Sequence, residues 1–563
     1  MSKLRRELAD VVAMRIPPKG EAPQPLPTHN KPKRPSRKWE IIMRQRVVGL
    51  LLLGLLASTS PAVAARPKTA RLSTHNAAKL SPALVATVSR SAPVSLVRVI
   101  VRGRGAAAAA AAVRAKATRP LGFGGVGAYV RASSVSRLAA SPGVTTVALD
   151  APIRFTATGT VSAGSLATIY PGRDSASNPW SAGATGRGVG IAVIDSGVTP
   201  SADFGSRLVQ VALDGQTGSL DDTVGHGTMV AGVAAGYSPD GKFIGIAPGA
   251  TVYAINISRP TGVYTSDVIT ALKWVYDNAH AYNIRVVNLS LTEDVASSYK
   301  DSLLDLAIER VWASGVFVAV AAGNRGAGQI DYAPANDPLA FTVGAFDPMN
   351  TSGPGDDTLS PWSSGGKTDD GFSKPELLAP GRHIGAPLPA GTTLDQDVPA
   401  PNRVAAGYAA INGTSFAAPQ VAGAAAIIFQ WHPDWSPDNV KWALIAKQGT
   451  KPRNTKIGSL SLSSSYNYSG TPGRANQGVP ALVCAPDSTC LSGSTIASKW
   501  DSSSWSSSSW SSSSWSSSSW SSSSWSAIAD WSSSSWSSSS WSSSSWSSTS
   551  WATSPDDGFD LWG

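Results

Sequence analysis

The chain has 563 residues with a formal net charge of +10, and 42% of its residues are hydrophobic. This length exceeds what one hydrophobic core usually supports, which excludes a single small module and predicts two or three ordered units with tails. The excess of basic residues does not indicate a nucleic-acid-binding protein, because where the charges lie matters more than their sum.

The charge is divided unevenly along the chain. Residues 1–65 carry a net charge of +8, residues 66–149 carry +13 with no acidic residue, and residues 150–563 carry −11. A basic segment followed by an acidic one predicts two parts that attract each other before they are separated. A compositional preference for arginine is the simpler alternative.

Residues 43–64 have the three-part pattern of a secretory signal peptide. A cationic stretch at 43–46 precedes an apolar run at 47–56, and Ala62-Val63-Ala64 is a small-x-small cleavage site. The apolar run is too short to span a membrane, so we expect a secreted, extracellular product. The extension at 1–42 is rich in Pro, Lys and Arg. We expect it to be a basic, disordered segment and hypothesise that translation starts at Met43.

Residues from about 90 to 150 are predicted to form a small, independent α/β unit. A run of Val and Ile favours a strand, and a run of alanines favours a helix. We expect strands at 96–101, 126–130 and 144–149 and helices at 106–116 and 133–140. The resulting order is β-α-β-α-β, with room for one more strand in the middle. A linker or a binding module is the alternative.

Three short blocks in the next region carry residues with catalytic potential. Asp195 ends a continuous apolar run, which predicts an acid at the carboxyl end of a buried parallel strand. His226 lies between two glycines at the start of a small-residue helix. Ser415 also opens a helix, where backbone N–H groups favour a developing oxyanion. Taken singly, these residues have ordinary alternatives, namely a loop carboxylate, a structural histidine and an N-cap serine.

Together the blocks resemble the signatures of the subtilase family of serine peptidases (peptidase S8). The order Asp, His, Ser differs from that of chymotrypsin-like proteases and of α/β-hydrolases. The blocks are Ile194-Asp195-Ser196-Gly197, His226-Gly227-Thr228 and Gly413-Thr414-Ser415-Phe416-Ala417-Ala418-Pro419. The resemblance implies a subtilisin-like three-layer α/β fold with a mostly parallel central sheet at 165–475. It also implies an endopeptidase that acts on proteins or peptides with Asp195, His226 and Ser415 as its catalytic triad.

The resemblance extends to two further segments. Residues 66–160 are similar to the inhibitor-type propeptide of subtilases, which implies a zymogen that is cut between about 150 and 170 and is transiently inhibited by its own propeptide. A buried strand at 316–320 leads to Asn324, and in subtilases an asparagine at this place points its amide into the oxyanion hole. A simple turn after Gly323 is the alternative for Asn324.

The strand at 286–291 resembles the family strand that pairs with an extended substrate. This likeness implies that Ser290, Leu291 and Gly323 contact substrate. The family usually has glycine after the Ser-Leu pair, whereas this chain has Thr292. A β-branched side chain at a normally bare position is expected to narrow the primary pocket, so the resemblance does not predict which residue is preferred before the scissile bond.

The chemistry of the triad requires no metal or other cofactor. Subtilases often bind structural calcium, and Asp221-Asp222 or Asp356-Asp357 could supply oxygen ligands. The spacing of these acids does not establish a calcium site, and solvated surface is the simpler interpretation of both pairs.

The chain changes character after about residue 475. Cys484 and Cys490 are the only cysteines, and in an exported chain they are predicted to close a small disulfide loop within a linker at 476–499. A low-complexity Trp-Ser repeat with a period of five fills most of 500–563. This period gives neither a strand nor a helix an apolar face. The alternatives are a solenoid of stacked tryptophans and a flexible tail for cell-surface or glycan contact, of which we favour the tail.

Three classes of function follow from these patterns. The first is a secreted, self-processing protease. The second is a binding protein whose repeat is the functional part and whose protease fold is a remnant, and the intact triad with Asn324 argues against it. The third is a non-proteolytic serine hydrolase of another fold, which the residue order and the lack of a Gly-x-Ser-x-Gly motif disfavour.

Overall fold

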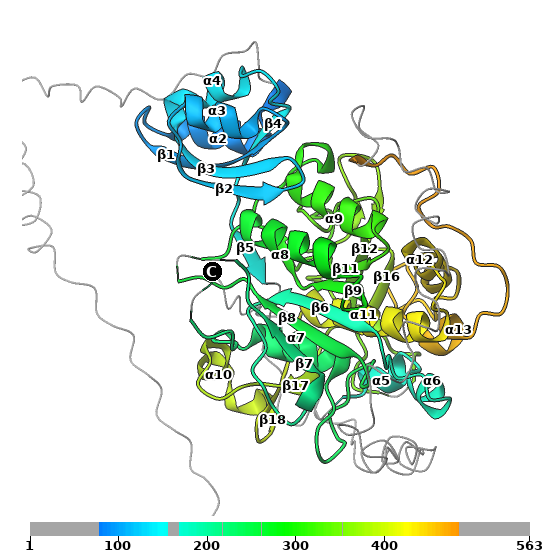
Figure 1. Ribbon diagram of the computed structural model, residues 1–563. Coiled ribbons are helices and arrows are strands. Elements are labelled where there is room, and N and C mark those ends of the chain that lie inside the picture. The colour runs from blue at the N-terminus through cyan, green and yellow to red at the C-terminus, as the bar shows by residue number, and fades with distance from the viewer. Residues whose placement is uncertain are drawn as a thin grey trace, which may run out of the picture. The chain divides into compact units, whose positions relative to one another are not determined.

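The computed structural model describes residues 78–155 and 168–482, except for positions 215, 217, 261 and 352 (Figure 1). The predicted signal peptide, basic extension, disulfide loop and Trp-Ser repeat lie outside these described residues. Among the described helices, none is both long and apolar enough to cross a membrane.

A mostly parallel sheet forms the centre of residues 168–482. Seven strands run parallel in the order β7-β8-β6-β9-β11-β12-β16, and β13 pairs antiparallel with β12. The chain adds strands first on one side of β6 and then on the other, so the sheet has its topological switch point at β6. The strands are β6 (Gly190–Asp195), β7 (Leu208–Val211), β8 (Thr251–Asn256), β9 (Ile284–Leu289), β11 (Phe317–Ala321), β12 (Phe341–Asp347), β13 (Thr358–Leu359) and β16 (Leu377–Pro380).

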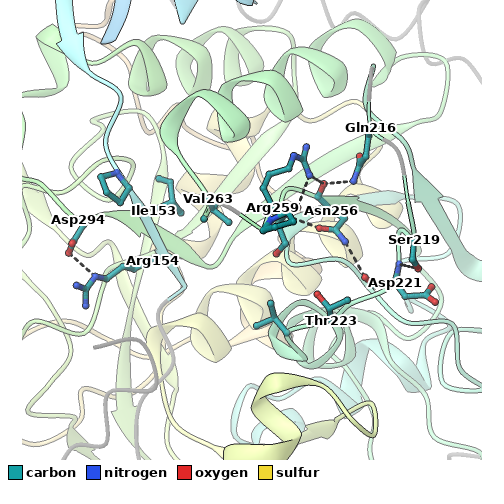
Figure 2. Close-up of a pocket in the computed structure, with 15 residues that line it drawn as sticks. Ile153, Arg154, Gln216, Ser219, Asp221, Thr223, Asn256, Arg259, Val263 and Asp294 are labelled. Carbon is teal, nitrogen blue, oxygen red and sulfur yellow. Dashed lines mark hydrogen bonds and ion pairs between the residues drawn. The ribbon is translucent and has the colours of Figure 1, made fainter. Parts of the chain in front are cut away.

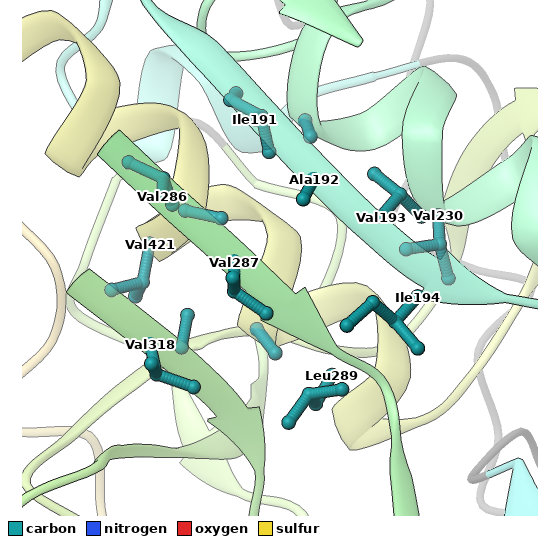
Figure 3. Packing of buried hydrophobic residues seen from close by; sticks show 14 of the residues in the cluster. Ile191, Ala192, Val193, Ile194, Val230, Val286, Val287, Leu289, Val318 and Val421 are labelled. Carbon is teal, nitrogen blue, oxygen red and sulfur yellow. The ribbon is translucent and has the colours of Figure 1, made fainter. Parts of the chain in front are cut away.

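Helices cover both faces of this sheet and give the fold its three layers. Helices α8 (Thr265–Asn278) and α9 (Leu303–Ala313) lie on one side of the strands, and α7 (His226–Ala235) and α11 (Thr414–Trp431) lie on the other (Figure 1). Valine and isoleucine side chains of the strands pack against Val230 of α7 and Val421 of α11 (Figure 3). The predicted three-layer α/β fold is therefore confirmed for this part of the chain.

Helices α7 and α11 approach their neighbours closely because they are built from small residues. All residues of α7 are buried, as are those of α11 from Thr414 to Phe429. A Cβ atom added at Gly423 would lie 2.7 Å from the Ile246 Cβ and 2.8 Å from the Ala234 carbonyl oxygen. A side chain there would force the helices apart, so glycine is required for this packing.

Residues 78–155 form a smaller α/β unit with a hydrophobic cluster of its own. Its antiparallel sheet has the order β2-β3-β1-β4. The elements are α2 (Pro82–Arg90), β1 (Leu96–Arg102), α3 (Ala106–Ala112), β2 (Lys116–Gly122), β3 (Gly125–Arg131), η2 (Ala132–Ser134), α4 (Val135–Ala139), β4 (Thr146–Leu149) and β5 (Ile153–Phe155). The extra middle strand is β2, and the predicted helix at 106–116 is too long because Arg114 has a positive φ of 55°.

Short elements complete the larger part. Helix α12 (Pro437–Ala446) begins with a capping box between Ser436 and Asn439. Strand β10 (Leu291–Glu293) follows β9 directly and pairs with β5. The remaining elements are α5 (Tyr170–Arg173), α6 (Ser177–Ser181), η3 (Gly205–Arg207), η4 (Tyr299–Asp301), β14 (Gly366–Lys367), β15 (Ser373–Lys374), β17 (Ile384–Pro387), α10 (Thr393–Asp397), η5 (Ala400–Asn402), β18 (Arg403–Ala405), β19 (Tyr408–Ile411) and α13 (Leu462–Tyr466).

Candidate active site

The carboxyl end of β6 holds a buried acid-imidazole pair. Asp195 is the last residue of β6, and His226 is the first residue of α7. The His226 Nδ1 atom donates to Asp195 Oδ1 over 2.8 Å, and both side chains are at most 1% exposed. The carboxylate also accepts from the Ser196 backbone N–H at 2.7 Å. The contact between His226 Nδ1 and Asp195 Oδ1 fixes the tautomer and the orientation of the ring, so that Nε2 is the nitrogen that can accept a proton.

Ser415 lies in the first turn of α11, which packs against α7. The His226 ring is 5.8 Å, centroid to centroid, from the ring of Phe416, the residue after Ser415. The Ser415 hydroxyl donates to the Ser290 carbonyl oxygen over 3.1 Å. The structure thus brings Asp195 into contact with His226, and it packs the helix that carries Ser415 against the helix that begins at His226.

A proline inside α11 ties the nucleophile candidate to the neighbouring strand. Pro419 has no backbone N–H, so the Ser415 carbonyl oxygen four residues earlier lacks its usual helical donor. The Ser290 hydroxyl donates to this oxygen over 2.8 Å instead. Ser290 and Ser415 each donate their hydroxyl to the other's backbone carbonyl oxygen. These two bonds fix the start of α11 against the residue that joins β9 to β10.

Asn324 follows β11 and Gly323 and presents its amide beside the start of α11. Its Oδ1 atom accepts from the Thr414 backbone N–H at 3.0 Å and from the Thr414 hydroxyl at 2.9 Å. These two bonds fix the orientation of the amide, and its Nδ2 atom is buried and has no hydrogen-bond partner among the described residues. A buried donor without a partner is costly unless a ligand or intermediate uses it, so this geometry fits an oxyanion-binding group.

A second carboxylate, which the sequence reasoning missed as part of this site, lies behind Asp195. Asp222 is 3% exposed and accepts from the Ser196 hydroxyl at 2.8 Å and from the Thr228 backbone N–H and hydroxyl at 2.8 Å each. The expectation of solvated surface was therefore wrong for Asp222, whose position four residues before His226 places it at the N-terminus of α7. Burial raises the pKa of Asp222, and hydrogen bonds from Gly225, Thr228 and Ser196 oppose that rise.

The predicted substrate strand is occupied by a segment of the chain itself. Residues Ile153, Arg154 and Phe155 of β5 pair antiparallel with Glu293, Thr292 and Leu291 of β10. A pocket of about 850 Å³ adjoins β5, and Figure 2 shows residues that line it, with the Arg154–Asp294 ion pair (2.9 Å) at one side. The β10 strand can therefore accept an extended peptide by strand addition.

No group of three or more metal-ligating side chains occurs among the described residues. Asp357 is 1% exposed and forms an ion pair with Arg173, so the expectation of solvated surface was also wrong for this residue.

The Glu376 carboxylate and the Ala340 carbonyl oxygen could together ligate a cation, but both accept hydrogen bonds from lysine side chains. Lys374 Nζ lies 2.6 Å and Lys441 Nζ 2.8 Å from Glu376 Oε1, and both donate to the Ala340 carbonyl oxygen. Burial lowers the pKa of Lys374 to about 8. The protein's own ammonium groups thus neutralise Glu376.

The site combines a buried Asp-His pair at the carboxyl end of β6, a serine at a helix start and a fixed amide donor after β11. This combination defines a subtilisin-like serine protease domain. The chain belongs to the subtilase family, whose profile matches residues 186–470.

Serine protease AprX from Bacillus subtilis (strain 168) is 36% identical over 281 residues, which cover 47% of this chain and 62% of that protein. Subtilisin Savinase from Lederbergia lenta is 32% identical over 281 residues, or 50% of this chain and 88% of that protein. The chain spans about 60% of the length of the first two relatives that it matches. The crystal structure of fervidolysin from Fervidobacterium pennivorans shares the fold, with a TM-score of 0.54 at 21% identity over 68% of this chain and 62% of that one.

Proposed function

We propose that the chain is a serine endopeptidase that cleaves peptide bonds through an acyl-enzyme. The observation that carries this proposal is the 2.8 Å contact between buried His226 and Asp195, next to the helix turn of Ser415. In the first step the Ser415 Oγ forms a bond to the scissile carbonyl carbon, and its proton passes to His226 Nε2. The tetrahedral intermediate then breaks its C–N bond, and His226 donates the proton to the leaving amine.

The second half of the reaction uses the same groups. A water molecule loses a proton to His226 and attacks the acyl carbon, and the departing Ser415 oxygen regains that proton. Asp195 holds the ring and stabilises the imidazolium that forms in both halves. Asn324 Nδ2 and the Ser415 backbone N–H stabilise the negative oxygen of each intermediate, and no cofactor is required.

We propose further that residues 66–160 act as a propeptide. Three contacts of the described residues with the larger part support this role. Asp150 accepts from the Ser266 backbone N–H (3.0 Å) in the first turn of α8, where a negative charge is favoured by the helix dipole. Arg119 forms an ion pair with Asp267 at 3.3 Å, and β5 lies along the substrate strand β10. A peptide in this position blocks access to Ser415.

Self-processing is expected to remove the N-terminal unit by a cut within residues 156–168, beyond the end of β5. Strand β5 pairs with β10 and then leads toward Ser290, whose carbonyl oxygen adjoins the Ser415 hydroxyl. Expression of the chain from Met43 should give a shortened active form that hydrolyses an unstructured protein, and N-terminal sequencing should place its first residue between 157 and 168. A mature form that keeps β5, or an intact chain without proteolytic activity, would contradict the proposal.

The isolated propeptide is expected to inhibit the mature enzyme in trans, and more strongly at low salt. The described segment has its own hydrophobic cluster, and its cation Arg119 pairs with Asp267. Salt shortens the Debye length from about 10 Å at 0.1 M to about 3 Å at 1 M, which weakens this attraction. Inhibition constants should be measured at both salt concentrations for the unaltered segment, for Arg119→Ala and for the exposed control Arg131→Ala.

Only Arg119→Ala should weaken inhibition and its salt dependence. If a saturating concentration of the isolated propeptide does not slow proteolysis, the segment is a linker and not an inhibitor.

We also infer export and surface association, on sequence grounds. Residues 43–64 support secretion, and the Trp-Ser repeat at 500–563 supports contact with a cell surface or a glycan. The partners that we expect are protein or peptide substrates and the propeptide, and not nucleic acid. Fractionation of a culture should place the mature form in the medium or on the cell surface, and retention of all protein inside cells would refute export.

A further inference from the structure

The pairing of β5 with β10 indicates where a substrate side chain meets the protein. Phe155 lies opposite Leu291 and Arg154 opposite Thr292, so a bound peptide in this register continues with a residue opposite Ser290. Because the Ser290 carbonyl oxygen lies 3.1 Å from the Ser415 hydroxyl, that residue is the one that precedes the scissile bond. Side chains that are opposite each other, or two residues apart, share a face of the ribbon. The side chain before the scissile bond therefore lies on the face that carries Thr292.

Gly323 lies beside the face of β10 that carries Thr292. Because Gly323 has no side chain, it leaves space between its own backbone and Thr292. A Cβ atom added at Gly323 would lie 3.6 Å from Thr292 Cγ2, 3.6 Å from Arg325 Nη1 and 3.2 Å from Ser364 Oγ. All three groups thus converge on the space that Gly323 leaves open. Thr292 and Arg325 therefore lie beside the space next to Gly323, on the face that the substrate side chain would share.

Arg325 is held in this position by several contacts. Its Nη1 atom donates to Thr292 Oγ1 at 2.9 Å, and its Nη2 atom donates to the Glu293 carbonyl oxygen at 3.1 Å and to Asp294 Oδ1 at 3.3 Å. The guanidinium carbon also lies 3.9 Å from the centroid of the Tyr332 ring. Hydrogen bonds that involve charged groups are stronger than neutral ones, so displacing this side chain is costly. The Arg325 side chain therefore stays in place beside the space next to Gly323.

We propose that Thr292 and Arg325 are specificity-determining residues that restrict the residue before the scissile bond to small side chains, such as Ala, Ser, Thr or Gly. This inference rests on the proposed peptidase function. The positive charge of Arg325 is already paired with Asp294, which argues against selection of an acidic side chain.

The segment that the enzyme is proposed to cut in its own precursor supports this size limit. Residues 156–167 consist of Thr, Ala, Gly and Ser apart from Val161 and Leu166, and they contain no aromatic and no charged residue. An enzyme that processes itself in this segment has to accept small residues before the scissile bond.

The test uses peptide p-nitroanilides that differ only in the residue before the scissile bond, namely Ala, Ser, Leu, Phe or Glu. The wild-type enzyme should have a kcat/KM for the Ala peptide at least about tenfold above that for the Phe peptide, in line with what steric exclusion from a pocket achieves. Thr292→Gly and Arg325→Ala should each raise the Phe to Ala ratio of kcat/KM by about tenfold or more. Arg187→Ala is the matched control, because Arg187 is exposed before the amino end of β6, at the opposite edge of the sheet.

The outcomes separate the inference from the proposed function. A wild-type preference for Phe or Leu, or a ratio that neither variant changes, would overturn the inference while leaving the peptidase intact. A preference for Glu that Arg325→Ala abolishes would overturn it in favour of charge recognition. If Arg325→Ala fails to fold, Thr292→Gly still decides the question, because that variant keeps the arginine. Failure of the wild-type enzyme to cleave any of the peptides or an unstructured protein would instead refute the proposed function.

Discussion

Replacing Ser415 by alanine is expected to lower kcat by about 10⁶-fold, the size of loss that follows removal of the same nucleophile in subtilisin. The change removes only the hydroxyl group, which donates to the Ser290 carbonyl oxygen over 3.1 Å. The Ser415 backbone still anchors α11, because its carbonyl oxygen accepts from the Ser290 hydroxyl. The variant should therefore fold with near-native stability while losing covalent catalysis.

The measurement compares precursor size and hydrolysis of an unstructured protein for wild type and Ser415→Ala expressed from Met43. The variant should accumulate as an uncut precursor without proteolytic activity, with an unchanged far-UV circular dichroism spectrum as the folding control. Ser290→Ala is a second control, because it removes the hydroxyl that binds the Ser415 carbonyl oxygen and leaves the nucleophile in place. This variant should still process its precursor. Equal processing of wild type and Ser415→Ala would show that Ser415 is not the nucleophile and would shift the interpretation to the repeat as the functional part.

Much of the fold could be predicted because buried parallel strands have continuous apolar sequences. The runs that end at Asp195 and before Asn324 became β6 and β11, and their positions in the sheet follow from the family resemblance. The end of helix α3 could not be read in the same way, since no Gly or Pro separates the alanine run from Lys116. There the left-handed backbone of Arg114 ends the helix, and local propensity does not encode such a turn.

The roles of residues that act through long-range contacts were less accessible to sequence reasoning. Asp222 looked like a surface acid because its neighbour Asp221 is polar, and only the fold shows that Ser196 and Thr228 surround it. Thr292 could be recognised as a departure from the family pattern. Its partner Arg325 is 33 residues away, and nothing in the sequence predicts that contact.

Replacing Asn324 by alanine is expected to lower kcat by about 10²–10³-fold with little change in KM. A donor to the oxyanion acts when negative charge develops on the carbonyl oxygen, so it stabilises the transition state more than the bound substrate. The Nδ2 atom of Asn324 is already oriented, because the two Thr414 donors hold the Oδ1 atom of the same amide at 3.0 and 2.9 Å. The size of the effect is that known for the corresponding donor of subtilisin.

Thr414→Val provides the matched comparison for Asn324→Ala. This variant removes the 2.9 Å hydroxyl bond but keeps the Thr414 backbone N–H, which still holds Asn324 Oδ1 at 3.0 Å. Its loss of kcat should therefore be much smaller than that of Asn324→Ala, and Asn324→Asp should be at least as damaging as alanine because a carboxylate repels the developing oxyanion. Steady-state kinetics on one peptide substrate would test all three variants. A large rise in KM at constant kcat for Asn324→Ala would assign Asn324 to ground-state binding instead, since uniform binding changes KM and not kcat.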